Sequence, residues 1–194
     1  MTVPRENGIV IGIVTDLDDP EDLGRVRVRF PHLNDEMSDW ARVATPMGGR
    51  GRGLFFRPER DDEVLVAHEH GDPRRSYIVG ALWSKPDPPP SDDGRKVDNN
   101  WRFFRSRSGH LMKFDDTSGS ERIEIVGSSG EHKVVIDVSG RKIEIACSTG
   151  DISISAPTGK LSIEANQVEI KAKATMDLQA TGAMTVQGAT VSIN

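Results

Sequence analysis

The sequence predicts an all-β protein, and three observations support this. Glycine and proline together number 30 (19 and 11) of 194 residues, whereas aromatic residues make up only 5%, a composition that favours strands and turns over helices. Residues 1–83 divide into short runs of alternating apolar and polar side chains, and the C-terminal half repeats pairs of aliphatic side chains at short intervals. Alternation with a period of two is typical of strands that bury one face.

Residues 1–84 are predicted to form a small closed barrel. The run at 25–30 alternates strictly, which places Arg25, Arg27 and Arg29 on one face and three apolar side chains on the other. Gly-Asp-Pro at 71–73 predicts a hairpin. Strands are expected at residues 8–17, 25–30, 40–45, 53–57, 63–69 and 76–83. Strands of this number and length fit an oligonucleotide/oligosaccharide-binding (OB) fold.

Residues 85–100 are predicted to be a proline-rich linker. Proline fixes the backbone and cannot join a central strand. The segment is also too short to contain another folded domain.

Residues 101–194 carry the strongest repeat in the sequence. Aliphatic residues recur in pairs two positions apart, and from Ile143 to Val191 six steps cover 48 residues, a mean of eight. Eight residues cannot include a helical crossover, so each repeat is one strand and a turn. The side chains predicted to form a buried core are Ile143, Ile145, Ile152, Ile154, Leu161, Ile163, Val168, Ile170, Met176, Leu178, Met184 and Val186.

Two architectures satisfy this repeat: a single-chain solenoid, and an intertwined triple-stranded β-helix made of three identical chains. A solenoid needs caps over its open ends, and the sequence stops within a strand pattern at 191–194. We therefore expect a homotrimer, with another protein covering the tip at Ala189, Thr190, Val191, Ser192, Ile193 and Asn194.

Three stretches of the sequence resemble one known family. They are GIVTDLDDPEDLGRVRVRFP at 12–31, WARVATPMGGRGRGLFFRPERDDEVLVAHEHGDPRRSYIVGALW at 40–83, and NNWRFFRSRSGHLMKFDDTSGSERIEI at 99–125. The first two are similar to the barrel of the phage baseplate assembly protein V and valine-glycine repeat spike family, and the third is similar to the start of that family's triple-stranded β-helix. The resemblance implies a homotrimeric spike of a contractile injection machine, without a cofactor, that pierces the target envelope on sheath contraction.

The resemblance also implies partners. These are the baseplate and inner tube, a hub at the barrel end, and a tip protein with proline-alanine-alanine-arginine repeats. The large N-terminal hub region, the lysozyme domain and the axial His-x-His pair of some family members are not found, so the hub and the tip are expected to be separate proteins.

Enzymatic and metal-binding alternatives have weaker support. A glycan hydrolase needs two carboxylates about 5–9 Å apart, and the pairs Asp61/Glu63 and Asp115/Asp116 are predicted to lie in solvated loops instead. His68 and His70, two positions apart and near Asp72, are weak metal candidates. We expect instead that His68 lies partly in the barrel wall and His70 near its rim. Cys147 is predicted to be a small core side chain and not a nucleophile.

Nucleic-acid binding by the barrel is a further alternative, with Arg25, Arg27 and Arg29 lining a groove. However, the formal net charge is −5, and residues 1–100 carry 14 basic against 19 acidic side chains, so nucleic acid is not an expected partner. Neither a signal peptide nor an apolar run of membrane-spanning length is present, so we expect assembly in the bacterial cytoplasm into a phage tail or tail-like particle, which then becomes a virion or an extracellular particle.

Residues 172–194 contain only two charged side chains, Lys173 and Asp177. A low-charge surface is expected at a narrow shaft end that meets a tip protein.

Overall fold

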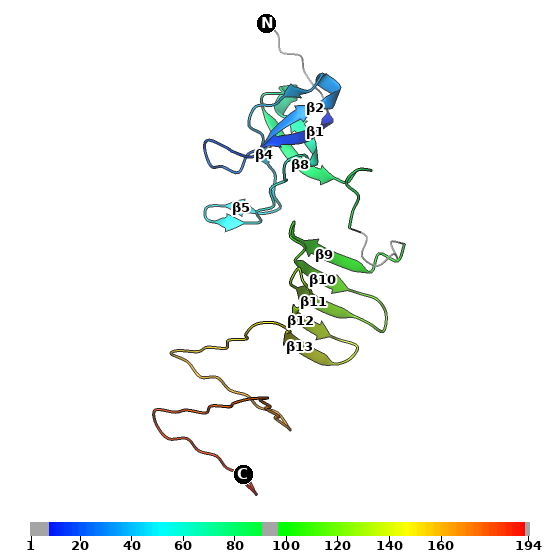
Figure 1. The fold of residues 1–194 in the computed structure, drawn as a ribbon. Coiled ribbons are helices and arrows are strands. Elements are labelled where there is room, and N and C mark those ends of the chain that lie inside the picture. Colours follow the sequence, from blue (N-terminus) through cyan, green and yellow to red (C-terminus); the bar gives the residue numbers. More distant parts are fainter. Residues whose placement is uncertain (1–7, 91–96, 193–194) are drawn as a thin grey trace. The chain divides into compact units, whose positions relative to one another are not determined.

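A computed structural model describes residues 8–90 and 97–192, which lie in two compact units, Met1–Asn99 and Asn100–Asn194 (Figure 1). Nearly all regular structure is β, the exceptions among the described residues being two 3-10 turns, Pro31–Leu33 and Glu69–Gly71. None of the helices described is long and apolar enough to span a membrane.

The first unit is built on a six-stranded sheet with the order β3-β2-β1-β7-β8-β4. Its strands are antiparallel except for the parallel pair β4 and β8. The strands are β1 (Ile9–Asp16), β2 (Arg27–Phe30), β3 (Glu36–Met37), β4 (Arg42–Val43), β7 (Glu63–His68) and β8 (Ser76–Leu82).

The sheet closes on itself just before β2 and β4. Val26 and Ala41 form a bridge with two backbone hydrogen bonds, of 3.0 and 2.8 Å. The predicted alternation of residues 25–30 is confirmed, because Val26, Val28 and Phe30 are all buried. The buried hydrophobic core is Val14, Val26, Val28, Phe30, Ala41, Val64, Val66 and Ile78.

The predicted strand at 53–57 is wrong. Gly48–Gly49 (β5) and Arg52–Gly53 (β6) form a separate two-stranded hairpin, and residues 54–58 that follow it belong to no strand. In the part of the chain that the structure describes, residues 54–58 have no neighbouring strand to pair with, and Pro58 lacks the N–H that a ladder requires. The other predicted strands are present, although residues 40–45 are reduced to the two-residue strand β4.

The second unit contains an antiparallel meander of five strands in the order β13-β12-β11-β10-β9, visible as the stacked green arrows in Figure 1. The strands are β9 (Trp101–Arg105), β10 (Leu111–Asp115), β11 (Arg122–Val126), β12 (His132–Asp137) and β13 (Lys142–Cys147). Residues 148–192 follow without an assigned strand or helix, and all of them are exposed. The strands predicted there have no neighbouring strand among the described residues of this one chain.

Candidate functional site

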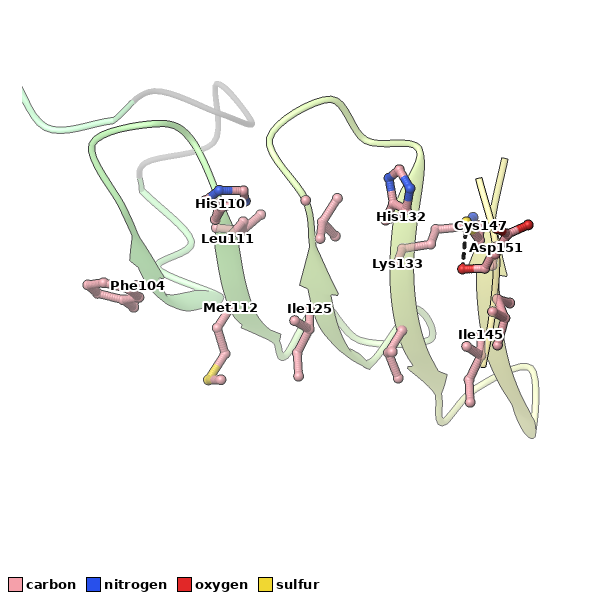
Figure 2. Close-up of a pocket in the computed structure, with 15 residues that line it drawn as sticks. Phe104, His110, Leu111, Met112, Ile125, His132, Lys133, Ile145, Cys147 and Asp151 are labelled. Carbon is pink, nitrogen blue, oxygen red and sulfur yellow. Dashed lines mark hydrogen bonds between the residues drawn. The ribbon is translucent and has the colours of Figure 1, made fainter. Parts of the chain in front are cut away.

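The aliphatic face of the five-stranded sheet is the most distinctive surface of the second unit. The register pairs Met112 with both Phe104 and Ile125, so these side chains form a row across the strands. Val134 and Ile145 continue the row. Figure 2 shows Met112, Ile125 and Ile145 on the same side of the sheet.

A second row runs parallel to the first. Phe114 pairs with Ile123, Ile123 with Ile136, and Ile136 with Ile143. The prediction that both members of each aliphatic pair lie on one face is therefore confirmed for β11, β12 and β13. The two rows together make a continuous apolar sheet face.

This face is open to solvent in the single chain. Ile125 is 50% exposed, Ile145 is 65% exposed and Ile143 is 71% exposed. The first row lines an open groove of about 630 Å³ that also includes His110, His132 and Ile152 (Figure 2). A groove of this kind is a surface that another polypeptide can fill.

The second unit buries charged side chains and exposes hydrophobic ones, which is the opposite of an ordinary protein core. In residues 100–192, the only buried side chains belong to the charged residues Lys113 and Asp115, and no hydrophobic side chain is buried. Folded domains normally bury aliphatic side chains first. This unit in isolation therefore lacks the hydrophobic core that would stabilise it.

The predicted core residues after β13 are also exposed. Ile154 is 72% exposed and Leu178 is 70% exposed, and the remaining members of the predicted set are exposed as well. Their burial by other copies of the chain stays a prediction.

Of the predicted tip residues, Ala189, Thr190, Val191 and Ser192 are exposed. Ile193 and Asn194 lie outside the described residues. Their contact with a tip protein is likewise a prediction.

The buried charges form a compact ionic cluster on the opposite face of the sheet. The Nζ of Lys113 lies 2.7 Å from a carboxylate oxygen of Glu124 and 3.5 Å from Asp115. It also lies 3.9 Å from the centre of the Trp101 ring. Burial opposes ionisation of Asp115, but hydrogen bonds from the hydroxyl and amide of Thr117 and the charge of Lys113 outweigh it and leave the pKa of Asp115 below its usual value.

This cluster overturns one prediction. Asp115 was expected in a solvated loop, but it is the last residue of β10 and its side chain is 6% exposed. Sequence reasoning missed it because the alternation of β10 alone does not reveal that Lys113 and Glu124 lie opposite each other. Asp61, of the other carboxylate pair, is exposed in a turn with φ of 72°.

His68 and His70 do not extend from one regular strand. β7 ends at His68, and His70 follows in a 3-10 turn with a left-handed φ of 54°. Nδ1 of His68 lies 3.0 Å from the hydroxyl of Ser76, and His70 is exposed. The strand geometry that suggested a shared metal ion is therefore absent at this pair, and no group of three potential metal ligands occurs among the described residues.

Cys147 lies at the end of β13, half-buried. Its thiol donates a hydrogen bond to the backbone carbonyl of Thr149, with a distance of 3.0 Å. Cys147 pairs with His132 at the edge of the apolar groove.

The three arginines of the barrel each contact groups of the same unit. Arg25 binds Asp19 at 2.7 Å, Arg29 binds Asp35 at 2.7 Å, and Arg27 donates to the carbonyl of Ser38 at 3.2 Å. Through these contacts the three arginines stabilise loops of the barrel.

A surface of the first unit that sequence reasoning missed is the segment 42–57, which includes the β5–β6 hairpin. Phe55 is 77% exposed and Phe56 is 60% exposed. The sequence did contain a signal for this surface, because residues 42–57 include four arginines and no acidic residue.

Comparisons with known proteins agree with the barrel fold of the first unit. Residues 10–83 match the model of a family described as the type VI secretion system/phage-baseplate injector OB domain. The chain is 29% identical over 111 residues to the type VI secretion system spike protein VgrG3 of Vibrio cholerae, covering 53% of this chain and 11% of that protein.

Two further relatives are similar. VgrG1a of Pseudomonas aeruginosa, also a type VI spike protein, is 25% identical over 58% of this chain and 19% of its own length. The actin cross-linking toxin VgrG1 of Vibrio cholerae is 26% identical over 62% of this chain and 12% of its own length. The chain therefore spans less than a fifth of the length of each of these three relatives.

Proposed function

We propose that this chain, which belongs to the phage baseplate V and valine-glycine repeat spike family, is the structural central spike of a contractile injection machine. The family match and the spike relatives support the general role. The finer proposal is that three copies of residues 101–194 wind into an intertwined β-helix that pierces a target envelope when the sheath contracts.

The observation that carries this proposal is the burial pattern of the second unit. Its aliphatic rows are exposed while its only buried side chains, among those described, are charged. Burying one aliphatic pair contributes roughly 3–6 kcal/mol before the entropy cost of ordering the chain is subtracted. Three copies around one axis would supply a dry position for every pair.

The backbone of residues 148–192 supports the same proposal. This segment carries regularly spaced aliphatic pairs but pairs with no strand of its own chain among the described residues. Strands that gain hydrogen bonds only from neighbouring chains cannot leave the assembly one at a time, which makes a shaft stiff and slow to unfold. Such a shaft transmits thrust without covalent chemistry, so the proposed role is mechanical and not enzymatic.

The proposed partners are a separate hub protein at the barrel end, the baseplate and inner tube, and a tip protein with proline-alanine-alanine-arginine repeats at the C-terminal end. The low charge of residues 172–194 supports a protein contact there. A binding assay between this chain and such a tip protein, with Thr190→Asp as the weakened variant and Asp177→Asn as the control, tests that contact.

The mass of the particle in solution tests the proposal as a whole. A trimer has three times the chain mass of 21.3 kDa, about 64 kDa. A monodisperse trimer over a wide range of dilution is the expected result. A stable monomer would contradict the proposal, because its aliphatic rows would then stay in water.

A further inference from the structure

The segment 42–57, here called the basic arm, stands out from the barrel by its charge. It contains Arg42, Arg50, Arg52 and Arg57 and no acidic residue. The rest of the described first unit, residues 8–41, 58–90 and 97–99, carries 7 basic and 16 acidic side chains, a net charge of −9. The arm, with a net charge of +4, therefore concentrates positive charge on an otherwise acidic unit.

The basic arm is a folded ribbon. β5 and β6 pair only with each other in the described structure, and Leu54 donates its N–H to the carbonyl of Met47 at 2.9 Å. The hydroxyl of Thr45 donates to the carbonyl of Leu54 at 2.6 Å. At Gly53, φ is 146° and a Cβ would lie 2.5 Å from the carbonyl oxygen of Met47, so only glycine fits this turn.

The arm also exposes large apolar side chains. Met47 is 50% exposed, Leu54 is 47% exposed and Phe55 is 77% exposed. Together with Leu23 they line an open groove of about 690 Å³, which Arg42, Arg52 and Arg57 flank. A complementary surface should present carboxylates around an apolar side chain.

The same barrel contains such a surface at β3, here called the acidic edge, residues 35–39. Glu36 and Asp39 are exposed, as is Asp35, which binds Arg29 of the same chain, and Met37 is 48% exposed among them. β3 is the outermost strand of the sheet order, next to β2. Ser38 is buried and anchors the edge, since its N–H donates to the carbonyl of Val28 at 2.7 Å and its hydroxyl accepts the N–H of Val28 at 3.0 Å.

We propose that the basic arm of each chain docks on the acidic edge of a neighbouring copy, so that three barrels form a closed head-to-tail ring. This inference rests on the proposed trimer. A head-to-tail ring needs two different complementary patches on every subunit. The arm and the edge are two such patches, opposite in charge and both containing exposed apolar side chains.

The small size of the basic arm favours another copy of this chain as its binding partner over a freely diffusing protein. A ribbon of 16 residues is smaller than the roughly 20–30 residues per partner of a standard stable interface. A barrel joined by the predicted linker at residues 85–100 to a common shaft has an effective local concentration on the order of millimolar. A weak contact between charged patches forms readily at that concentration.

The experiment uses the chain of residues 1–194 with Cys147→Ser, Met47→Cys and Met37→Cys, which leaves every charge of both patches unchanged. Oxidation should link arm to edge between chains and give a covalent trimer on a denaturing gel. Adding Arg50→Glu and Arg52→Glu should slow the linking by about tenfold, because attraction becomes repulsion. Adding Glu36→Lys and Asp39→Lys to those reversals should restore it.

The matched control reverses the acidic β1–β2 loop instead of the edge, with Asp18→Lys and Glu21→Lys, and should not restore linking. A solution trimer without covalent trimers, or a link formed within one chain, would overturn the docking inference and leave the spike proposal standing. A solution monomer would remove both. Salt-dependent binding of a single-stranded oligonucleotide that Phe55→Ala and Arg52→Glu abolish would also overturn it, because the arm would then serve another partner.

Discussion

The ammonium of Lys113 on β10 lies 2.7 Å from the carboxylate of Glu124 on β11, at directly paired positions of the two strands. The side chain of Lys113 is only 9% exposed and that of Glu124 is 15% exposed. This ion pair is therefore shielded from water, whereas the aliphatic side chains of the same unit are exposed to it. It links β10 to β11 through side chains that are buried within one chain.

Replacing Lys113 with methionine should destabilise the second unit strongly. The change leaves Glu124 and Asp115 without their common cation, and breaking a buried ion pair on one side costs roughly 3–5 kcal/mol. The measurement is the free energy of unfolding in urea, with the Trp101 ring beside Lys113 as a fluorescence probe.

Lys142→Met is the control for Lys113→Met. Lys142 also binds a glutamate, Glu144, but its side chain is 63% exposed. An exposed pair contributes less than about 1 kcal/mol. Equal effects of the two substitutions would show that burial of the Lys113 cluster is not important for stability.

Acid should weaken the contacts of Glu144. Hydrogen bonds from Lys133, and then from Lys142, lower the pKa of Glu144 to about 2 from a usual value of 4.5. Because the folded pKa is the lower one, the stabilisation is complete above about pH 4.5 and is lost as the pH falls toward 2. The urea midpoint measured from pH 6 to pH 2 should fall less steeply in Glu144→Gln, and identical slopes in both proteins would contradict the prediction.

Alanine substitutions at two strand glycines of the barrel, Gly12 and Gly80, test how tightly the barrel core is packed. At Gly12 on β1, an added Cβ would lie 3.0 Å from Val66 and 3.1 Å from Val28, both fully buried. Gly12→Ala should cost about 1–3 kcal/mol by overpacking. Thermal unfolding of the barrel measures this cost.

Gly80→Ala is the matched control, because its Cβ would meet only the side chain of Leu65, at 3.9 Å. Replacing a glycine where space exists is neutral or stabilises by up to about 1 kcal/mol through the unfolded state. A Gly12→Ala protein as stable as Gly80→Ala would show that the contact of β1 with β2 and β7 is looser than the structure indicates.

The alternation of apolar and polar residues correctly predicted which side chains lie on the same face of a strand. Val26, Val28 and Phe30 are buried as their alternation predicted, and the pairs Ile123/Ile125 and Val134/Ile136 share a sheet face through the observed register. In the barrel, alternation alone therefore identifies the buried face. In the second unit it identifies only which side chains share a face, because that face is open in the single chain.

The features that sequence reasoning missed depend on contacts between segments. The Lys113 cluster needs the β10–β11 register, which follows from turn geometry and not from either strand alone. The strand predicted at 53–57 had the right residue types but no neighbouring strand, because the β5–β6 hairpin pairs only with itself among the described residues. Propensity specifies a strand only when a partner strand is available.

The aliphatic pairs of residues 148–192 allow the most direct test of the proposed shaft. Ile154 and its neighbour Ser153 are both exposed in the single chain, but in an intertwined β-helix they would face opposite sides. Ile154→Asp should therefore place three carboxylates on a dry axis and abolish the trimer, since burying an unpaired charge is prohibitive. Ser153→Asp should leave the trimer intact, and the milder Ile154→Ala should cost about 2–5 kcal/mol per chain. Sedimentation of the three proteins at equal concentration measures the difference, and a trimer that tolerates Ile154→Asp as well as Ser153→Asp would exclude an aliphatic axis at this repeat.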